Sequence, residues 1–232
     1  MGAIARTLTA LALIVGVAAG PAAIGAVPAR PSMPLIENPV GGGQDTLVIL
    51  YSGDGGWAAF DRGVVAGLAH RGVPSVGVNS LRYFWTRRTP QEAADDLAVV
   101  ARRYLAAWRK RRIILVGYSF GANALPIIIP QLPPDLRGRL RSVALIGAAR
   151  NGELQFHVGS WLNRAGPDAT PLAPLMQQLR GVPAVCIYGD DEPDSACGAF
   201  PPGAIRPVRL PGGHHLDDDG EAVAETILGA SA

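Results

Sequence analysis

The chain has 232 residues, of which 48% are hydrophobic and 17% are charged. This length fits one domain with a substantial core, and the composition argues against disorder beyond the amino terminus. The formal net charge of +2 is too small to indicate nucleic-acid binding or strong attraction to anionic membranes.

The first thirty residues have the pattern of an export signal. Arg6 precedes an apolar stretch at residues 8–19, and small residues dominate positions 20–29. Such a pattern is typical of a secretory signal, and an uncleaved membrane anchor is the alternative. Two pairs of small residues fit a cleavage site, Ala23 with Gly25 and Val27 with Ala29. We therefore assign residues 1–30 to the signal or anchor and residues 31–232 to a single domain, and we expect a periplasmic or secreted protein.

Short aliphatic runs alternate with helical patterns through the rest of the chain. Strands are predicted at residues 47–51, 75–78, 113–117, 143–146 and 184–188. These runs are apolar on both faces, as strands are in a parallel sheet that helices cover on both sides. The alternation predicts an α/β domain with an open, doubly wound and mostly parallel sheet.

The helical patterns carry recognisable start signals. Helices are predicted from Asp61 to about Arg71, from Thr89, directly after Ser119, and from about Asp219 to Leu228. Asp61 is expected to cap the first, which stops at Gly72. Thr89 and Glu92 form a capping box for the second. Its apolar residues recur at helical spacing: Ala93, Leu97, Val100, Tyr104 and Trp108.

The most specific chemical signal surrounds a serine. Residues 117–121 read Gly-Tyr-Ser-Phe-Gly, between an apolar run and a predicted helix. This is the context of a nucleophile elbow, a sharp strand-to-helix turn that exposes a serine between two glycines. Ser119 is therefore the predicted nucleophile. The alternative is that it only caps the helix that follows.

A serine nucleophile needs a base, which four histidines could supply. His214 and His215 follow residues 210–213, a loop expected after a further, last strand near the chain end, where an α/β-hydrolase carries its base. We predict His214, which directly follows two glycines. His70 is expected at the end of a surface helix. His157 lies in an aperiodic segment at residues 148–172, predicted to be an insertion where a lid would sit.

The acid is expected in the loop after the strand at residues 184–188. Its spacing after Gly189 and before a proline selects Glu192, with Asp194 as second choice, and the other carboxylates there are solvated charges. Cys186 and Cys197 are the only cysteines, and a disulfide between them would tie this loop to its strand. Two buried thiols are the alternative. The order serine, acid, histidine predicts an α/β-hydrolase fold.

An oxyanion needs backbone donors, and two are predicted. One is the N–H of Phe120, and the other is the N–H of Asp54, in a glycine-rich loop at residues 52–57. That loop lacks the lysine and the hydroxyl of a phosphate-binding P-loop. The carboxylate of Asp54 would oppose an oxyanion, so we expect it to point outward and bind a cationic substrate group.

Arginines surround an aromatic segment after the second predicted strand. Arg82, Arg87 and Arg88 flank the aromatic residues 83–85. The arginines, Arg82 above all, could bind a phosphate while the aromatic rings rest at a lipid interface. The alternative is surface charge around core aromatics.

At these residues the sequence resembles the family of the bacterial virulence protein VirJ and the C-terminal domain of its relative AcvB. The matching stretches are residues 51–57 (Tyr-Ser-Gly-Asp-Gly-Gly-Trp), 80–85 (Ser-Leu-Arg-Tyr-Phe-Trp) with Thr89-Pro90, 117–122 (Gly-Tyr-Ser-Phe-Gly-Ala) with Leu125-Pro126, Tyr188-Gly189, and Gly213-His214. Together they extend from about residue 46 to the chain end. Asn123 stands where an aspartate is expected, which would alter a helix contact and spare the triad. The chain looks like the shorter VirJ form.

The resemblance implies a periplasmic serine hydrolase that releases lysine from lysyl-phosphatidylglycerol, in a family linked to virulence and type IV secretion. Two other functions stay open: a general esterase, lipase or thioesterase for neutral acyl chains, and a non-catalytic periplasmic adaptor. The expected partners are a small-molecule or lipid-headgroup ester, the membrane surface by peripheral contact, and secretion-system proteins. We expect no nucleic acid, cofactor or metal.

Overall fold

The computed structural model describes residue 2 and residues 33–41, 44–157, 168–179, 181–193 and 195–230. The expected export signal and the second-choice acid, Asp194, lie outside the described residues. So does the middle of the expected insertion, residues 158–167. The described chain from Met33 onward belongs to one unit, Met33–Ala232.

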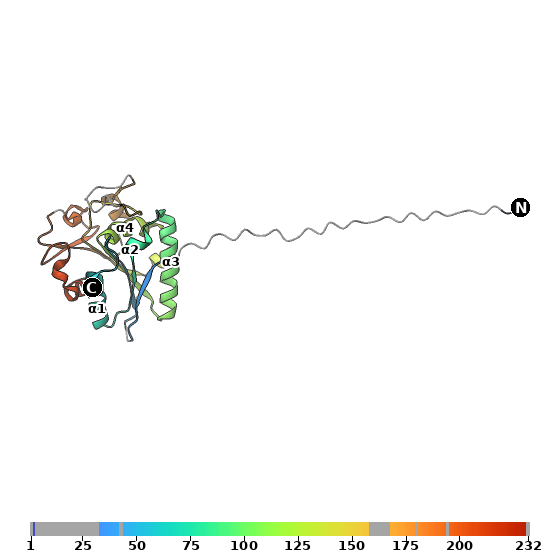
Figure 1. Cartoon of the computed structure of the whole chain (residues 1–232), viewed down its shortest axis with the longest axis horizontal. Helices are drawn as coiled ribbons and strands as arrows, with labels where there is room; N and C mark the ends of the chain where they lie inside the picture. Colours follow the sequence, from blue (N-terminus) through green and yellow to red (C-terminus); the bar gives the residue numbers. More distant parts are fainter. Residues whose placement is uncertain are drawn as a thin grey trace. The chain divides into compact units, whose positions relative to one another are not determined.

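Seven strands form the central sheet, in the order β1-β3-β2-β4-β5-β8-β9 (Figure 1). Their bounds are β1 (Leu35–Asn38), β2 (Thr46–Tyr51), β3 (Ser75–Val78), β4 (Arg112–Tyr118), β5 (Leu140–Ile146), β8 (Ala184–Gly189) and β9 (Arg206–Leu210). Only β1 is antiparallel to its neighbour, β3. This confirms the predicted doubly wound, mostly parallel sheet. Because β3 and β4 lie on opposite sides of β2, the strand order reverses there, and ligands of such sheets bind at that point.

Helices cover both faces of the sheet because both faces are apolar. Along β2, Leu47, Ile49 and Tyr51 belong to one buried cluster, and Val48 and Leu50 belong to the other. Helices α3 (Pro90–Ala107) and α4 (Phe120–Ile128) pack on the first cluster. Helices α1 (Ala59–His70) and α7 (Gly220–Gly229) pack on the second and against each other (Figure 1). Short helices are α2 (Ser80–Tyr83), α5 (Pro134–Arg137) and α6 (Ala173–Met176).

The helix starts agree with the sequence signals with one exception. The Thr89 side chain and Glu92 form the predicted capping box of α3. The prediction that Asp61 is the N-cap of α1 is wrong, because Ala58 holds that position. Asp61 is the third helical residue, and its carboxylate reaches back to accept a hydrogen bond from the Ala58 N–H at 2.8 Å. It therefore satisfies an amino-terminal donor from inside the helix.

Several short elements are not indicated by the sequence, among them an edge strand of the sheet. Strand β1 is only four residues long and part-exposed. Two strands of two residues, β6 (Asn151–Gly152) and β7 (Thr170–Pro171), pair at the two ends of the predicted insertion. Among the residues described, no helix is both long and apolar enough to cross a membrane.

Candidate active site

Ser119 lies at a sharp turn between β4 and α4. Its φ of 50° and ψ of −111° place a non-glycine residue in a backbone region that is rarely populated. Its N–H donates to the Ile146 carbonyl at 2.8 Å, which fixes the turn against the end of β5. This strained strand-to-helix geometry is that of a nucleophile elbow, and it directs the hydroxyl away from the sheet.

The turn is held close to the end of β2 because position 121 is a glycine. A Cβ on Gly121 would lie 2.3 Å from the Tyr51 carbonyl oxygen, closer than any real contact allows. The Gly121 N–H also donates to the Ser52 carbonyl at 3.2 Å. The elbow is therefore packed directly on the loop that follows β2.

His214 lies in the loop after β9, which we call the His loop (residues 211–219). Its Nε2 is 3.0 Å from the Ser119 Oγ, so the serine hydroxyl can donate to the imidazole. The ring lies over Gly147, where an added Cβ would be 2.6 Å from the ring carbon Cε1. Gly147 also has a φ of 62°, so both its conformation and the imidazole above it require glycine.

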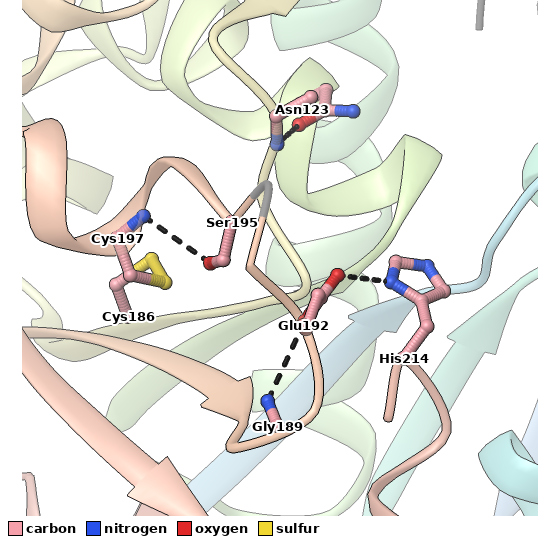
Figure 2. The surroundings of a disulfide bond; sticks show 8 residues. Asn123, Cys186, Gly189, Glu192, Ser195, Cys197 and His214 are labelled. Carbon is pink, nitrogen blue, oxygen red and sulfur yellow. Dashed lines mark hydrogen bonds and ion pairs between the residues drawn. A yellow bond between two sulfur atoms is a disulfide. The ribbon is translucent and has the colours of Figure 1, made fainter. Parts of the chain in front are cut away.

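Glu192 completes the arrangement from the loop after β8. Its Oε1 is 2.5 Å from the His214 Nδ1, and Figure 2 shows the two side chains pointing toward each other. The Gly189 N–H donates to the other carboxylate oxygen at 3.4 Å. The Glu192 side chain is 16% exposed and that of His214 is 40% exposed, so the acid lies beneath the imidazole and the imidazole faces solvent.

The structure thus brings together the three side chains predicted as nucleophile, base and acid. The Ser119 hydroxyl donates to Nε2 when the imidazole is neutral, and the Nδ1–H of His214 then donates to Glu192. This tautomer is the one that can accept a proton from a serine. Along the chain the order is serine, acid, histidine, as predicted. The strands that precede these residues, β4, β8 and β9, lie in the same order across the sheet.

A disulfide between Cys186 and Cys197 ties the acid-bearing loop to β8. Cys186 lies in that strand, and Cys197 lies in a short 3-10 helix, η4 (Ala196–Ala199), and both are buried. The Ala196 N–H also donates to the Ala148 carbonyl at 3.0 Å, which joins η4 to the end of β5. The predicted disulfide is present (Figure 2), and it leaves no free cysteine.

The glycine-rich loop after β2 lies beside the serine. A Cβ on Gly53 would be 3.4 Å from the Ser119 Cβ, and the Gly56 N–H donates back to the Gly53 carbonyl at 3.2 Å. Asp54, half-buried, is at the tip of this tight turn. Phe120 is the first residue of α4, so its N–H is an amino-terminal donor without an intrahelical acceptor. Both predicted oxyanion donors therefore belong to segments that meet at Ser119.

The arginine–aromatic segment is part core and part surface. Tyr83 and Phe84 are buried, whereas Trp85 is 63% exposed and stacks on Phe156. Arg82 is exposed at the end of α2. Arg87 pairs with Asp168 at 3.2 Å and Arg88 stacks over the Tyr83 ring. Only part of the segment is therefore open to a ligand.

The other histidines have contacts of their own. His70 is exposed and pairs with Glu221 at 2.6 Å. His157 is half-buried, with its Nε2 3.8 Å from a Glu153 oxygen, at the wall of a cavity of about 200 Å³. His215 bonds Tyr118, not the serine. Of the four histidines, only His214 has a contact with Ser119 in the described structure.

Three contacts around the site have no counterpart in the sequence reasoning. The Asn123 Oδ1 accepts from the Ala149 N–H at 2.8 Å (Figure 2), which holds the start of the segment at residues 148–157 against α4. The Asp190 carboxylate accepts from the Gly212 N–H at 2.8 Å. Tyr118 bonds His215 at 2.9 Å. The sequence offers one signal for these contacts: each involves a residue next to or within a segment predicted to be part of the site.

The surroundings of the elbow are acidic. Burial is the main cause that raises the pKa of the Tyr118 phenol above its ordinary value, and nearby carboxylates raise it further. These carboxylates are Asp61, Asp54, Glu192 and Asp218. Several carboxylates therefore lie close to the residue that precedes Ser119.

A serine at such an elbow, a histidine after the last strand and an acid between them define the α/β-hydrolase class. Solved structures of this class superpose on the chain. The proline iminopeptidase of Mycobacterium smegmatis does so with a TM-score of 0.58 and 13% identity, over 85% of this chain and 94% of that one. The naproxen esterase (carboxylesterase NP) of Bacillus subtilis does so with a TM-score of 0.57 and 16% identity, over 84% and 85%. At these identities the likeness shows the fold.

Residues 45–232 match the family described as bacterial virulence protein VirJ, and the chain belongs to this family. Among curated proteins, Carboxylesterase Culp1 of Mycobacterium tuberculosis and that of Mycobacterium bovis are each 29% identical over 104 residues. The match covers 44% of this chain and 46% of the relative. The chain thus spans a little under half the length of these curated relatives.

Proposed function

We propose that the chain is a serine hydrolase that cleaves carboxylic esters, with Ser119 as nucleophile, His214 as base and Glu192 as acid. The observation that carries the proposal is the pair of contacts at the imidazole. Nε2 is 3.0 Å from the serine Oγ, and Nδ1 is 2.5 Å from the glutamate. The curated relatives named carboxylesterase support the same reaction class.

The proposed reaction has two halves, acylation and deacylation, and each half uses both contacts of the His214 imidazole. The Ser119 Oγ attacks the acyl carbon as its proton moves to the His214 Nε2, and Glu192 stabilises the imidazolium. The N–H groups of Phe120 and Asp54 bind the oxyanion of the tetrahedral intermediate. The C–O bond to the alcohol breaks and His214 returns its proton to the leaving oxygen. Water then attacks the acyl-serine while His214 again takes up and returns a proton, and the carboxylic acid product is released from Ser119.

The proposed substrate is the aminoacyl ester of lysyl-phosphatidylglycerol. Family membership and charge support it: the substrate has two ammonium groups on its lysyl part and a phosphate in its lipid part. The acidic surroundings of Tyr118 suit the ammonium groups, with Asp54 at the tip of a loop beside the serine. The exposed Arg82 suits the phosphate.

The proposed location is the periplasm or the exterior, at the membrane surface that holds the lipid. The buried disulfide supports an oxidising compartment. The exposed Trp85 supports peripheral contact with the bilayer interface. A link to type IV secretion rests on family membership alone, and a partner that binds the Ser119→Ala protein equally well would indicate an adaptor role beside catalysis.

A general esterase for neutral acyl esters is the second candidate. The curated relatives favour it, since they are carboxylesterases. The two candidates share the nucleophile and differ in whether the enzyme needs a cationic acyl group.

One experiment tests the reaction and separates the substrates. The purified protein is assayed for lysine release from lysyl-phosphatidylglycerol vesicles and for hydrolysis of p-nitrophenyl butyrate. Ser119→Ala is expected to lower both rates by at least about a thousandfold, and unchanged turnover would eliminate the proposal. Asp54→Asn is expected to raise KM for the lysyl ester by roughly tenfold, or about 1.4 kcal/mol, and to spare the butyrate. Equal effects on both esters would favour the general esterase.

A further inference from the structure

The residue immediately before Ser119 contacts two segments of the proposed active site. Tyr118 is only 5% exposed, at the end of β4. Its hydroxyl lies 2.9 Å from the Nδ1 of His215, the neighbour of His214. A Cβ on Gly53 would be 3.2 Å from its ring, so the ring also touches the loop that carries Asp54.

The ring of Tyr118 is held in place by other aromatic groups. Its centroid lies 4.2 Å from that of Phe60 in α1 and 5.4 Å from that of His214. The two histidine rings themselves lie 6.0 Å apart and nearly perpendicular, at 82°. His215 is therefore directed to the tyrosine while His214 is directed to the serine.

The His loop has an unusual backbone directly after these histidines. Leu216, Asp217 and Asp218 have φ values of 50°, 53° and 56°, a run of left-handed residues without glycine. Such residues persist only where surrounding contacts over-determine them. The loop thus needs anchors, and its histidines stand at the start of the strained run.

Several contacts anchor the loop along its length. Before the histidines, the Asp190 carboxylate accepts from the Gly212 N–H at 2.8 Å. After them, the side chain of Leu216 is 2% exposed, in the core that α1 and α7 form with the sheet. Between these two, the Tyr118 hydroxyl bonds His215. This bond joins the His loop to the end of β4, next to the bond between His214 and Ser119.

We propose that Tyr118 and His215 are positioning residues, whose hydrogen bond holds the His loop so that His214 reaches Ser119. The proposal rests on the proposed function of Ser119 and His214. Because His214 and His215 are consecutive, an anchor on one limits the movement of the other. A displacement of about 1 Å at a reacting pair can cost on the order of a hundredfold in rate. The bond should therefore affect kcat far more than KM.

The test measures kcat and KM for p-nitrophenyl butyrate, a neutral ester that does not depend on the lysyl substrate. Tyr118→Phe keeps the ring and removes the hydroxyl, and His215→Phe removes the acceptor. Each is expected to lower kcat by roughly tenfold to a hundredfold and to change KM by less than about threefold. The double variant is expected to be no slower than the slower single variant, because both substitutions remove the same bond.

Two further variants separate positioning from damage to the fold. His215→Asn keeps an acceptor near the position of Nδ1 and is expected to restore kcat to within about threefold of the wild type, whereas His215→Ala is not. Tyr104→Phe removes a hydroxyl that bonds Glu37 far along α3, and it should leave kcat unchanged. Because His215 is exposed, these histidine variants can be compared even if Tyr118→Phe does not fold.

The outcomes are distinguishable from those of the proposed function. Wild-type kcat in Tyr118→Phe, multiplicative losses in the double variant, or equal rates in His215→Asn and His215→Ala would each overturn the positioning role. If Ser119→Ala abolishes hydrolysis while those results are found, only the present inference fails. If Ser119→Ala is fully active, the proposed function fails first.

Discussion

Asp61 shows how one residue can serve local structure at the expense of stability. Its carboxylate accepts from the Ala58 N–H at the start of α1, yet its side chain is fully buried. Its Oδ1 has no hydrogen-bond partner among the described residues. Burial raises the pKa of this carboxyl to about 6, against the opposing effects of the backbone hydrogen bonds and the nearby Arg62. The charged form is thus disfavoured in the folded chain.

This pKa predicts a pH dependence of stability. Because the folded state binds the proton more tightly than the unfolded state, the contribution of Asp61 is fully present below about pH 4. It is lost as the pH rises through about 6, by up to about 3 kcal/mol. Asp61→Asn keeps an acceptor for Ala58 and cannot ionise. It should be more stable than the wild type to urea at about pH 7, and this advantage should disappear at about pH 4.

The matched control is Asp135→Asn, at an exposed carboxylate in α5. It is expected to show no gain in unfolding free energy that grows with pH. A stability difference between Asp61→Asn and the wild type that is the same at both pH values would contradict the assignment of the effect to this carboxyl.

Among the site residues, those on sharply defined motifs could be identified from the sequence. Ser119 follows from the glycines that an elbow requires, and His214 from its place after the last strand. The spacing after Gly189 predicts Glu192, and this is the carboxylate that contacts the imidazole. The bond between Tyr118 and His215 could not be found in this way. It depends on where the carboxyl ends of β4 and β9 lie relative to each other, and no local sequence pattern encodes that.

At the scale of elements, the loop after β8 positions the proposed acid. It carries Glu192 and joins β8 to η4. The disulfide closes this loop onto its own strand with a sequence separation of 11. A crosslink of this size removes loop entropy from the unfolded chain, worth about 3 kcal/mol. The same crosslink limits the movement of the acid.

We expect the double variant Cys186→Ser/Cys197→Ser to lose about 3 kcal/mol of unfolding free energy and to have a lower kcat. Unfolding in urea with and without dithiothreitol measures the first effect. The reductant should bring the wild type down to the stability of the variant and leave the variant unchanged. Equal stability of the oxidised and reduced wild type would show that the disulfide does not stabilise the fold.

Elements with strong patterns were predictable and those with weak patterns were not. The buried central strands read as continuous apolar runs, and α3 has both a capping box and an apolar stripe. Strand β1 was missed because an edge strand of four part-exposed residues resembles a loop in sequence. The pairing of β6 with β7 was missed for another reason. It joins residues about twenty positions apart across a segment without a period.

At the scale of the whole molecule, the sheet order brings distant parts of the chain to one edge. The nucleophile follows a central strand, the acid and the base follow the last two strands, and the oxyanion loop follows β2. The alternation of strands and helices predicts this meeting at the carboxyl ends of the strands. It does not predict which helices touch. Helices α1 and α7 pack through small residues, and the sequence does not indicate which helix these residues contact.

Helix α1, early in the chain, packs closely against α7 near the chain end. A Cβ on Gly67 of α1 would lie 2.7 Å from the Gly220 carbonyl oxygen and 2.9 Å from the Ala224 Cβ. On Gly63, one turn earlier, it would meet nothing nearer than 3.7 Å. The same substitution at the two positions therefore separates helix packing from helix propensity.

Gly67→Ala is expected to lose about 1–3 kcal/mol of unfolding free energy, because α7 must move away from α1. Gly63→Ala should be neutral or gain about 0.5–1 kcal/mol, because alanine favours the helix. Since α7 begins at the end of the His loop, with Asp219 as its N-cap, only Gly67→Ala should also lower kcat. Urea unfolding and ester hydrolysis of the two variants, measured side by side, check both expectations. Equal stability of the two alanine variants would mean that the crossing tolerates a methyl group and that the His loop does not depend on how closely α7 docks.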